Sequence, residues 1–245
     1  MGIGEALAQL FAAKGAAVVM CSRDAARAEA ARARVGHPER TLALACDVRH
    51  REEVERLLSL TLHDFGRLDI WINNAGHGLH DTVAEMDLAA CREMFETNLF
   101  GAIHGMQVAV PVMSRQGGGT IINISSVAGH IPVPLGAAYS ASKFAMNAIG
   151  KAARLELKDA GIHVMTVCPG YIATAFKDNV VRGHSQRRLG TPMKGISAER
   201  VARAVWRGYR KQKREVVVPG RDRIFITLYQ LWPGMVEYFM AKMIK

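Results

Sequence analysis

Residues 120–143, TIINISSVAGHIPVPLGAAYSASK, combine an apolar run, two serines and a helical pattern. The run at 120–124 predicts a short buried strand, because its β-branched residues carry no charge. Ser125 and Ser126 follow directly, and a helix is predicted over 138–159. A strand that leads through a short loop into a helix is the repeating unit of parallel sheets that helices cover on both faces.

The same alternation continues toward both ends of the chain. Further helices are predicted over 4–14, 24–35, 50–64, 88–113 and 197–211, and further strands over 16–20, 42–46, 68–72, 162–167 and 215–218. The predicted fold class is therefore α/β, with a doubly wound parallel sheet in three α/β/α layers. The sequence shows no internal repeat or linker, so we expect one domain over 1–220 and an amphipathic helical tail over 221–245.

The composition excludes several classes of protein. The chain has 245 residues, of which 49% are hydrophobic and 22% charged, as is typical of a soluble globular domain. The formal net charge is +10, but no recognition motif accompanies it, so no nucleic-acid partner is expected. Scattered cysteines without a C-x-x-C pair, and an N-terminus without a secretory signal, predict a reduced cytoplasmic setting. The histidines and cysteines show no metal-ligand spacing, so no metal is expected.

Polar or glycine-containing clusters follow the predicted strands. They are Ser22-Arg23, Asp47-Val48, Asn73-Asn74-Ala75-Gly76, Ser125-Ser126 and Pro169-Gly170. Open parallel sheets bind their ligands at the carboxyl ends of the strands. These clusters therefore predict one shared ligand site.

Together these motifs resemble the classical type of the short-chain dehydrogenase/reductase family. The matching pieces are GIG at 2–4, DV at 47–48, NNAG at 73–76, Asn98, ISSVAG at 124–129, YSASK at 139–143 and PG at 169–170. They cover nearly the whole chain in the family's order, and Ser126 precedes Tyr139 by 13 positions, as in the family motif. The resemblance implies a Rossmann-like fold and an oxidoreductase that interconverts an alcohol and a ketone or aldehyde by hydride transfer. It also implies a homodimer or homotetramer.

The resemblance implies a catalytic set of Asn98, Ser126, Tyr139 and Lys143. Tyr139 and Lys143 are four residues apart on a predicted helix, so their side chains share one face. An ammonium about 4 Å from the phenol would lower the pKa of Tyr139 by as much as ~3 units and suit it to act as acid or base. By resemblance, Lys143 also holds the nicotinamide ribose, Ser126 binds the substrate oxygen, and Asn98 holds a water that links Lys143 to solvent.

The cofactor-binding residues implied by the resemblance begin at the N-terminus. They are Gly2, Ile3, Gly4, Ser22, Arg23, Asp47, Val48, Asn74, Ala75, Gly76, Tyr139, Lys143, Pro169, Gly170, Ile172 and Thr174. Ser22 and Arg23 look like the NADP pattern, in which the guanidinium binds the 2′-phosphate. NADP is therefore favoured, while NAD stays open because Arg23 is alternatively a solvated loop residue.

The start of the chain departs from the family pattern. The family opens with a strand and the turn T-G-x-x-x-G-x-G, of which only Gly2 and Gly4 match. We favour a true start that lies upstream, because the other site residues are intact. The alternative is a non-catalytic dinucleotide-binding or scaffold protein with a damaged phosphate turn. Without the first strand, the strands predicted over 16–20 and 68–72 are expected to face a gap.

By resemblance, the substrate contacts Ser126, Tyr139, His77, His130 and Tyr171. The surroundings of these residues are mostly apolar, which favours a hydrophobic alcohol or ketone. The loop over 172–194 is basic, which leaves an acidic or acyl-carrier substrate open.

The tail carries two apolar stripes, separated by Pro233-Gly234. The first holds Ile224, Phe225, Leu228, Leu231 and Trp232, and the second holds Met235, Val236, Phe239, Met240 and Met243. We expect both stripes to pack on the domain or at a subunit interface. A peripheral membrane contact is the less favoured alternative, and it would be helped by Arg221, Arg223, Lys242 and Lys245.

Overall fold

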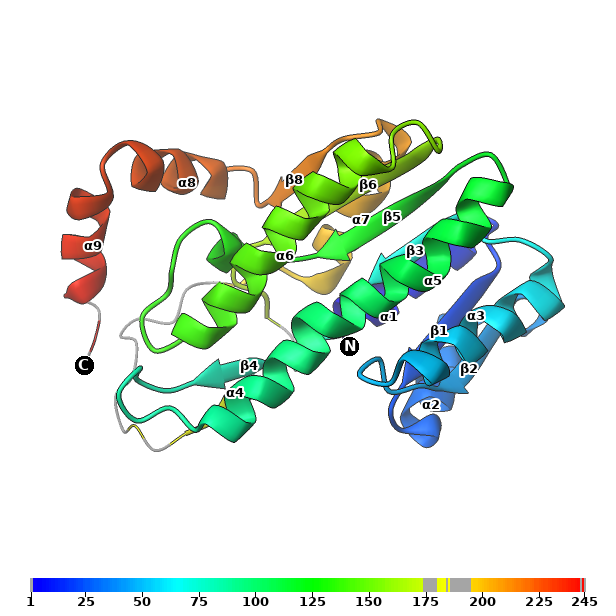
Figure 1. Cartoon of the computed structure of the whole chain (residues 1–245), viewed down its shortest axis with the longest axis horizontal. Helices are drawn as coiled ribbons and strands as arrows, with labels where there is room; N and C mark the ends of the chain where they lie inside the picture. The colour runs from blue at the N-terminus through cyan, green and yellow to red at the C-terminus, as the bar shows by residue number, and fades with distance from the viewer. Residues whose placement is uncertain (1, 174–179, 184, 186–194, 243, 245) are drawn as a thin grey trace.

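Figure 1 shows the computed structural model of the chain, which describes residues 2–173, 180–183, 185, 195–242 and 244. The helices are α1 (Ile3–Ala13), α2 (Ala25–Val35), α3 (Arg51–Phe65), α4 (Leu88–Phe95), α5 (Gly101–Arg115), α6 (Ala137–Glu156), α7 (Ala198–Arg210), α8 (Asp222–Leu231) and α9 (Pro233–Ala241). The strands are β1 (Val18–Ser22), β2 (Thr41–Ala45), β3 (Ile70–Asn73), β4 (Gly78–His80), β5 (Gly119–Ile124), β6 (Ile162–Pro169), β7 (Val180–Arg182) and β8 (Glu215–Val218). The predicted alternation of helices and strands is confirmed.

Two features of the element order differ from the prediction. The helix predicted over 88–113 is interrupted, because Glu96–Phe100 forms a π-helical turn between α4 and α5. The short strands β4 and β7 were not predicted, and they pair in parallel, with Gly78 opposite Val180. Three residues are too few to show the alternation of apolar and polar side chains that marks a strand.

The strand pairs of the described residues are all parallel, as predicted. The larger sheet has the order β3-β5-β6-β8, while β1 pairs with β2 and β4 pairs with β7. The division between the first two sheets lies between β1 and β3, the strands that we expected to face a gap. No described residue pairs with their facing edges.

Helices cover both faces of the four-stranded sheet, which gives the predicted Rossmann-like three-layer arrangement. On one face, Phe11 of α1 and Val205 of α7 pack against the buried side chains of β5 and β6. On the other face, Val54 of α3 and Met113 of α5 belong to a second core with Ile121 of β5. This packing aligns the carboxyl ends of the strands along one edge of the sheet.

Helix α1 joins the two sheets. Leu7 and Phe11 lie in the core of the four-stranded sheet, and the Phe11 ring stands edge-on to Trp206 at 5.2 Å between centroids. Ala8 and Ala12, one position further along the helix in each case, pack with Val35 of α2 against β1. One helix therefore supplies buried side chains to the cores on both sides of the division.

The C-terminal tail forms α8 and α9, which Figure 1 shows as an orange-to-red arm at the end of the molecule toward which β5 points. Only Asp222 and Ile226 of α8 are buried, and α9 has no buried residue. Packing on the domain, one of the two arrangements that we expected, is therefore not found for most described members of the stripes, and packing at a subunit interface stays a prediction. Met243 and Lys245 lie outside the described residues. Among the described helices, none has the length and apolar character needed to cross a bilayer.

Candidate active site

The predicted catalytic residues gather where β5 ends. Ser126 follows β5 directly and caps the 3₁₀ turn Val127–Gly129, since its Oγ accepts a hydrogen bond from the Ala128 N–H at 3.1 Å. Tyr139 and Lys143 lie in the first two turns of α6 on one face, with Lys143 Nζ 5.7 Å from the centre of the Tyr139 ring. A hydrogen bond joins Tyr139 to Ser126. The structure thus places three of the four residues around one point.

Asn98 completes the group from the π-helical turn. It is fully buried, its Oδ1 accepts from the His77 N–H at 2.9 Å, and its Nδ2 donates to the His77 carbonyl at 2.9 Å and to Ser142 Oγ at 3.1 Å. A π-helical turn is rare and often occurs at functional sites. This turn directs Asn98 toward the loop that follows β3. The predicted role of Asn98 as the holder of a water stays a prediction.

The absence of a side chain at Gly76 lets the loop after β3 approach Asn98 and Lys143 closely. A Cβ on Gly76 would stand 3.0 Å from Asn98 Oδ1 and 3.6 Å from Lys143 Nζ. The backbone of the NNAG stretch therefore passes directly over two of the predicted catalytic side chains. A larger residue at 76 would push the loop away from them.

Lys143 is held inside the protein by the sheet. Its side chain is buried, and Nζ donates a hydrogen bond to the Ile124 carbonyl at 3.0 Å. Burial disfavours the ammonium and lowers the pKa of Lys143 to about 8. The lysine is therefore close to losing its charge at the upper end of the physiological range.

The expectation for the phenol of Tyr139 is wrong for this structure. Burial raises the pKa of Tyr139 to about 12, and the hydrogen bond with Ser126 offsets only part of that rise. The physical reason is that burial desolvates the phenolate, while the ammonium of Lys143 is directed at the Ile124 carbonyl. Tyr139 is thus a proton donor in the form described.

The cofactor-binding residues near the N-terminus surround an open helix end. Gly2 is the N-cap of α1, no side chain caps this helix, and no atom lies within 4 Å of the place where a Gly2 Cβ would stand. Gly4 faces Asn74, because a Cβ on Gly4 would stand 2.7 Å from Asn74 Nδ2. Uncapped N–H groups at a helix N-terminus attract anions, so this end fits the pyrophosphate of a dinucleotide.

The residues predicted to hold the adenosine end lie at the ends of β1 and β2. Arg23 is exposed and its Nη1 lies 3.8 Å from Oε1 of Glu93. The Asp47 carboxylate accepts hydrogen bonds from Arg49, whose Nη1 also donates to Glu93 at 2.9 Å. Arg23 therefore stands at the rim of a network of alternating charges, with its guanidinium accessible to an anionic ligand.

The remaining predicted cofactor residues follow the same edge. Ser22 ends β1, Val48 packs beside Gly101, and Ala75 is exposed in the loop after β3. Pro169 ends β6, Gly170 lies against the Asp222 carboxylate, and Ile172 bridges to Ile196. Ile3 starts α1, and Thr174 lies outside the described residues.

The predicted substrate residues separate into two groups. Tyr171 is at the surface, and the partly buried His77 ring has an Nδ1 without a hydrogen-bond partner among the described residues. Burial lowers the pKa of His77, which favours a neutral ring. The structure places His77 beside Asn98, at the predicted site, with its Nδ1 buried.

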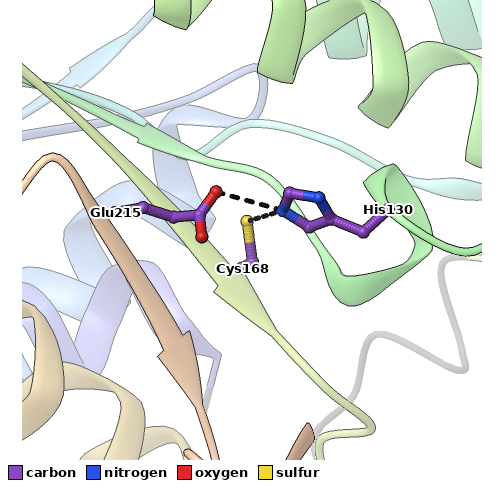
Figure 2. A group of neighbouring side chains, drawn as sticks. All are labelled: His130, Cys168 and Glu215. Atoms are coloured by element: carbon purple, nitrogen blue, oxygen red, sulfur yellow. Dashed lines mark hydrogen bonds and ion pairs between the residues drawn. The ribbon is translucent and has the colours of Figure 1, made fainter. Parts of the chain in front are cut away.

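His130 is engaged elsewhere, as Figure 2 shows. Its Nε2 lies 3.1 Å from Oε2 of Glu215 and 3.4 Å from Sγ of Cys168, and the other carboxylate oxygen of Glu215 accepts from Arg223 at 2.9 Å. The hydrogen bond with His130 is the main reason why the pKa of Glu215 lies below its usual range. These contacts occupy the Nε2 that a substrate would otherwise meet.

His130, Cys168 and Glu215 also form a group of potential metal ligands that the spacing of histidines and cysteines in the sequence did not indicate. Their donor atoms all lie within 4.8 Å of one another, although residues 130, 168 and 215 are too far apart in the chain to form a ligand motif. Because Arg223 and His130 together satisfy the Glu215 carboxylate, we interpret the group as a chain of ion pairs that joins the loop after Ser126 to β8 and α8. No spacing pattern in the sequence predicts this group.

Comparisons with known proteins support one family. The family model for short chain dehydrogenases matches residues 1–185. Dehydrogenase/reductase SDR family member 7B of Danio rerio is 30% identical over 98% of this chain and 81% of its own length. The 3-ketoacyl-(acyl-carrier-protein) reductase of Brucella melitensis, solved with NADH, has a TM-score of 0.80 at 25% identity, covering 90% of this chain and 94% of that chain. The alcohol dehydrogenase of Thermococcus sibiricus, solved with 5-hydroxy-NADP, has a TM-score of 0.76 at 25% identity, covering 89% and 91%.

Proposed function

Because this chain belongs to the short-chain dehydrogenase family of oxidoreductases, we propose that it is an NADP-dependent enzyme that interconverts an alcohol and a ketone or aldehyde. The observation that carries the proposal is the meeting of Ser126, Tyr139, Lys143 and Asn98 at the carboxyl end of β5. Chemistry at this edge is what a parallel α/β sheet favours.

The cofactor supplies or accepts a hydride at its nicotinamide ring when it is bound. In this chain, Gly2 and Gly4 would hold its pyrophosphate, Arg23 its 2′-phosphate, and Lys143 its nicotinamide ribose. The protein itself must then transfer a proton to or from the substrate oxygen.

Tyr139 is the residue that moves this proton. In the direction of reduction, the neutral phenol donates its proton to the carbonyl oxygen, while the Ser126 hydroxyl donates a hydrogen bond that polarises the carbonyl. The tyrosinate that results is stabilised by the ammonium of Lys143, which lies on the same face of α6. With a pKa of about 12 the phenol carries its proton at neutral pH, and the attraction of Lys143 grows as charge appears on the phenolate oxygen.

The preference for NADP rests on Arg23. The similar solved structures include one complex with NADH and one with 5-hydroxy-NADP, so the fold accepts either cofactor. Arg23 is exposed at the end of β1, and its partner Glu93 is 3.8 Å away, which is a weak surface pair. A phosphate dianion would compete well for this guanidinium.

A non-catalytic dinucleotide-binding protein is the second candidate. It is favoured by the division between β1 and β3, the two strands that flank the predicted phosphate turn. Such a protein would bind NADPH and turn over no carbonyl compound. The burial of Asn98 and Lys143, whose side chains are hydrogen-bonded to Ser142 Oγ and to the Ile124 carbonyl respectively, favours the enzyme instead.

The test compares Tyr139→Phe with the wild type on a panel of hydrophobic ketones, aldehydes and 3-ketoacyl thioesters. We expect kcat to fall by about 10²–10⁴-fold, because only the proton-carrying hydroxyl is removed. NADPH binding, measured by cofactor fluorescence, should change little. Tyr209→Phe, on α7 and packed against Phe11, is the control and should keep full activity.

Two results would contradict the proposal. One is a Tyr139→Phe variant that keeps more than about a tenth of the wild-type kcat, which would remove the proton role from this residue. The other is a wild-type protein that binds NADPH and reduces no member of the panel, which would support the non-catalytic candidate.

A further inference from the structure

The arm formed by α8 and α9 concentrates the exposed apolar surface of the molecule. Of the fifteen large hydrophobic side chains that are exposed among the described residues, seven lie between 224 and 239. They are Ile224, Phe225, Leu231, Trp232, Met235, Tyr238 and Phe239, each 47–63% exposed. Such a concentration of exposed apolar side chains on two consecutive helices is typical of an interaction site.

The arm is a fixed structure rather than a loose chain end. Ile226 and Asp222 are buried, and Arg223 binds Glu215 of β8 at 2.9 Å. The Tyr229 hydroxyl donates to Oε1 of Glu237 at 3.2 Å, which sets α9 against α8. The body thus uses one side of α8, and the remaining apolar side chains of the arm are presented outward.

The charges around the arm are mainly positive. Lys151 of α6 lines a hollow of about 530 Å³ between α6 and the arm, together with Phe144, Tyr229 and Pro233. Arg221 is exposed at the start of α8, and Lys242 Nζ lies 4.2 Å from the centre of the Tyr238 ring. Glu237, the acidic residue of α9, is hydrogen-bonded to Tyr229. The partner should therefore be anionic as well as apolar.

We propose that the α8–α9 arm binds the surface of an anionic lipid bilayer and lies in its interface. Helix α9 is apolar apart from Glu237 and the Tyr238 hydroxyl yet buries no residue, and its exposed apolar side chains suit the interface of a bilayer. Trp232 and Tyr238 have the amphipathic rings that gather at the headgroup level. Lys151, Arg221 and Lys242 would meet lipid phosphates and carboxylates.

A second copy of the chain fits the arm less well. A symmetric contact places the same patch of each copy face to face, so that the positive charges of Arg221 and Lys242 from both copies would gather at one interface. The formal net charge of +10 on each chain adds to that repulsion. An anionic surface would instead be attracted both by Arg221 and Lys242 and by the positive net charge of the chain.

The arm lies beside the candidate active site. Asp222, the first residue of α8, lies against Gly170, and the hollow under the arm is also lined by His130, four residues beyond Ser126. Docking would therefore bring the loop after Ser126 close to the bilayer, where an apolar alcohol or ketone would be dissolved. This last step depends on the proposed function, whereas lipid binding by itself does not.

The test is cosedimentation of the full chain with vesicles of phosphatidylcholine containing 30% phosphatidylserine, and with pure phosphatidylcholine vesicles, at 0.1 M salt. We expect binding to the first and at least about tenfold weaker binding to the second. The double variant Trp232→Ser/Phe239→Ser should lose at least about tenfold on anionic vesicles, and Arg221→Gln/Lys242→Gln should lose the preference for them. Leu155→Ser and Lys158→Gln are the matched controls, because Leu155 is exposed in the last turn of α6 and Lys158 is exposed just after this helix, both outside the arm.

Failure of the wild type to bind anionic vesicles would overturn the proposal, as would equal binding by the arm variants. Light scattering of the same proteins measures their oligomeric state as a second readout. If the Trp232→Ser/Phe239→Ser change dissolves an oligomer of the wild type, the arm is an interface between copies and the proposal is wrong. Loss of carbonyl reduction in every sample would instead contradict the proposed function and leave the vesicle result standing.

Discussion

The half of the molecule built on β3, β5, β6 and β8 holds its functional side chains in the interior, whereas the half built on β1 and β2 presents them to solvent. Lys143 and Asn98 are buried, and their polar atoms bond to main-chain groups. Arg23 is exposed, and its partner Glu93 is exposed as well. Buried hydrogen bonds fix a geometry, while exposed ion pairs contribute only about 0–1 kcal/mol and rearrange easily.

The two halves therefore differ in how far the residues for proton transfer and for cofactor binding are fixed in position. The side chains to which we assign the proton chemistry are held in place without a ligand, because buried polar groups are paired within the protein. The adenosine end is free to exchange one ion pair for another when an anion binds. Helix α1, which contributes to the cores on both sides, is the described element that keeps the halves in register.

The largest expected effect belongs to the buried half and is tested at Lys143. Lys143→Met should lower kcat by about 10²–10⁴-fold and leave NADPH bound through the adenosine half, because only the stabilising ammonium is lost. In the wild type, kcat/KM for ketone reduction should fall as the pH rises through about 8, where Lys143 loses its proton. Lys143→Arg should move this fall to higher pH, and an unmoved fall would assign it to another group.

The same pKa predicts a change in stability with a definite sign. The folded pKa of about 8 lies below the ordinary lysine value of 10.5, so the unfolded chain binds more protons between these two values. The free energy of unfolding contributed by Lys143 should therefore rise as the pH increases from about 8 to about 10.5. Urea unfolding of the wild type relative to Lys143→Met measures this contribution, and a difference that does not change across that range would show that burial is not the cause of the shift.

The next effect sharpens the role of α1 between the halves. Phe11→Ala should reduce the free energy of unfolding by about 3–5 kcal/mol, because it empties a buried site beside Trp206 and Tyr209. Phe225→Ala, which removes an exposed ring, should change it by less than about 0.5 kcal/mol. Urea denaturation measures both. A similar decrease in the free energy of unfolding for the two variants would show that the Phe11 side chain of α1 does not stabilise the core.

The smallest effect belongs to the exposed half. Arg23→Ala should weaken NADPH binding by about ten- to a hundredfold, from the loss of a charge-assisted contact of ~1.5–3 kcal/mol, and leave NADH binding and the kcat at saturation nearly unchanged. Arg27→Ala, an exposed arginine one helical turn further on, is the control. Titration by cofactor fluorescence reports both affinities. Equal losses for NADPH and NADH would mean that Arg23 supports the loop instead of binding the phosphate.

The sequence was sufficient for whatever depends on short-range pattern. The strand at 120–124, the helix that carries Tyr139 and Lys143, and the clusters after each strand follow from local periodicity and spacing, because apolar side chains at those intervals can be buried in only one way. The gap between β1 and β3 was implied by the resemblance to the family, in which a further strand pairs with both of them. The adenosine-end residues were located in the same way, although their cofactor preference stays a prediction.

Tertiary structure alone decided the rest. The π-helical turn at Asn98, the contact of His130 with Cys168 and Glu215, and the outward display of the α8–α9 arm join residues that are far apart in the chain or depend on what lies around them. The pKa of Tyr139 is the clearest case. The spacing to Lys143 predicted a lowered value, and burial reversed it, because the cost of desolvating a charge depends on every atom that replaces water and no short segment of sequence contains that information.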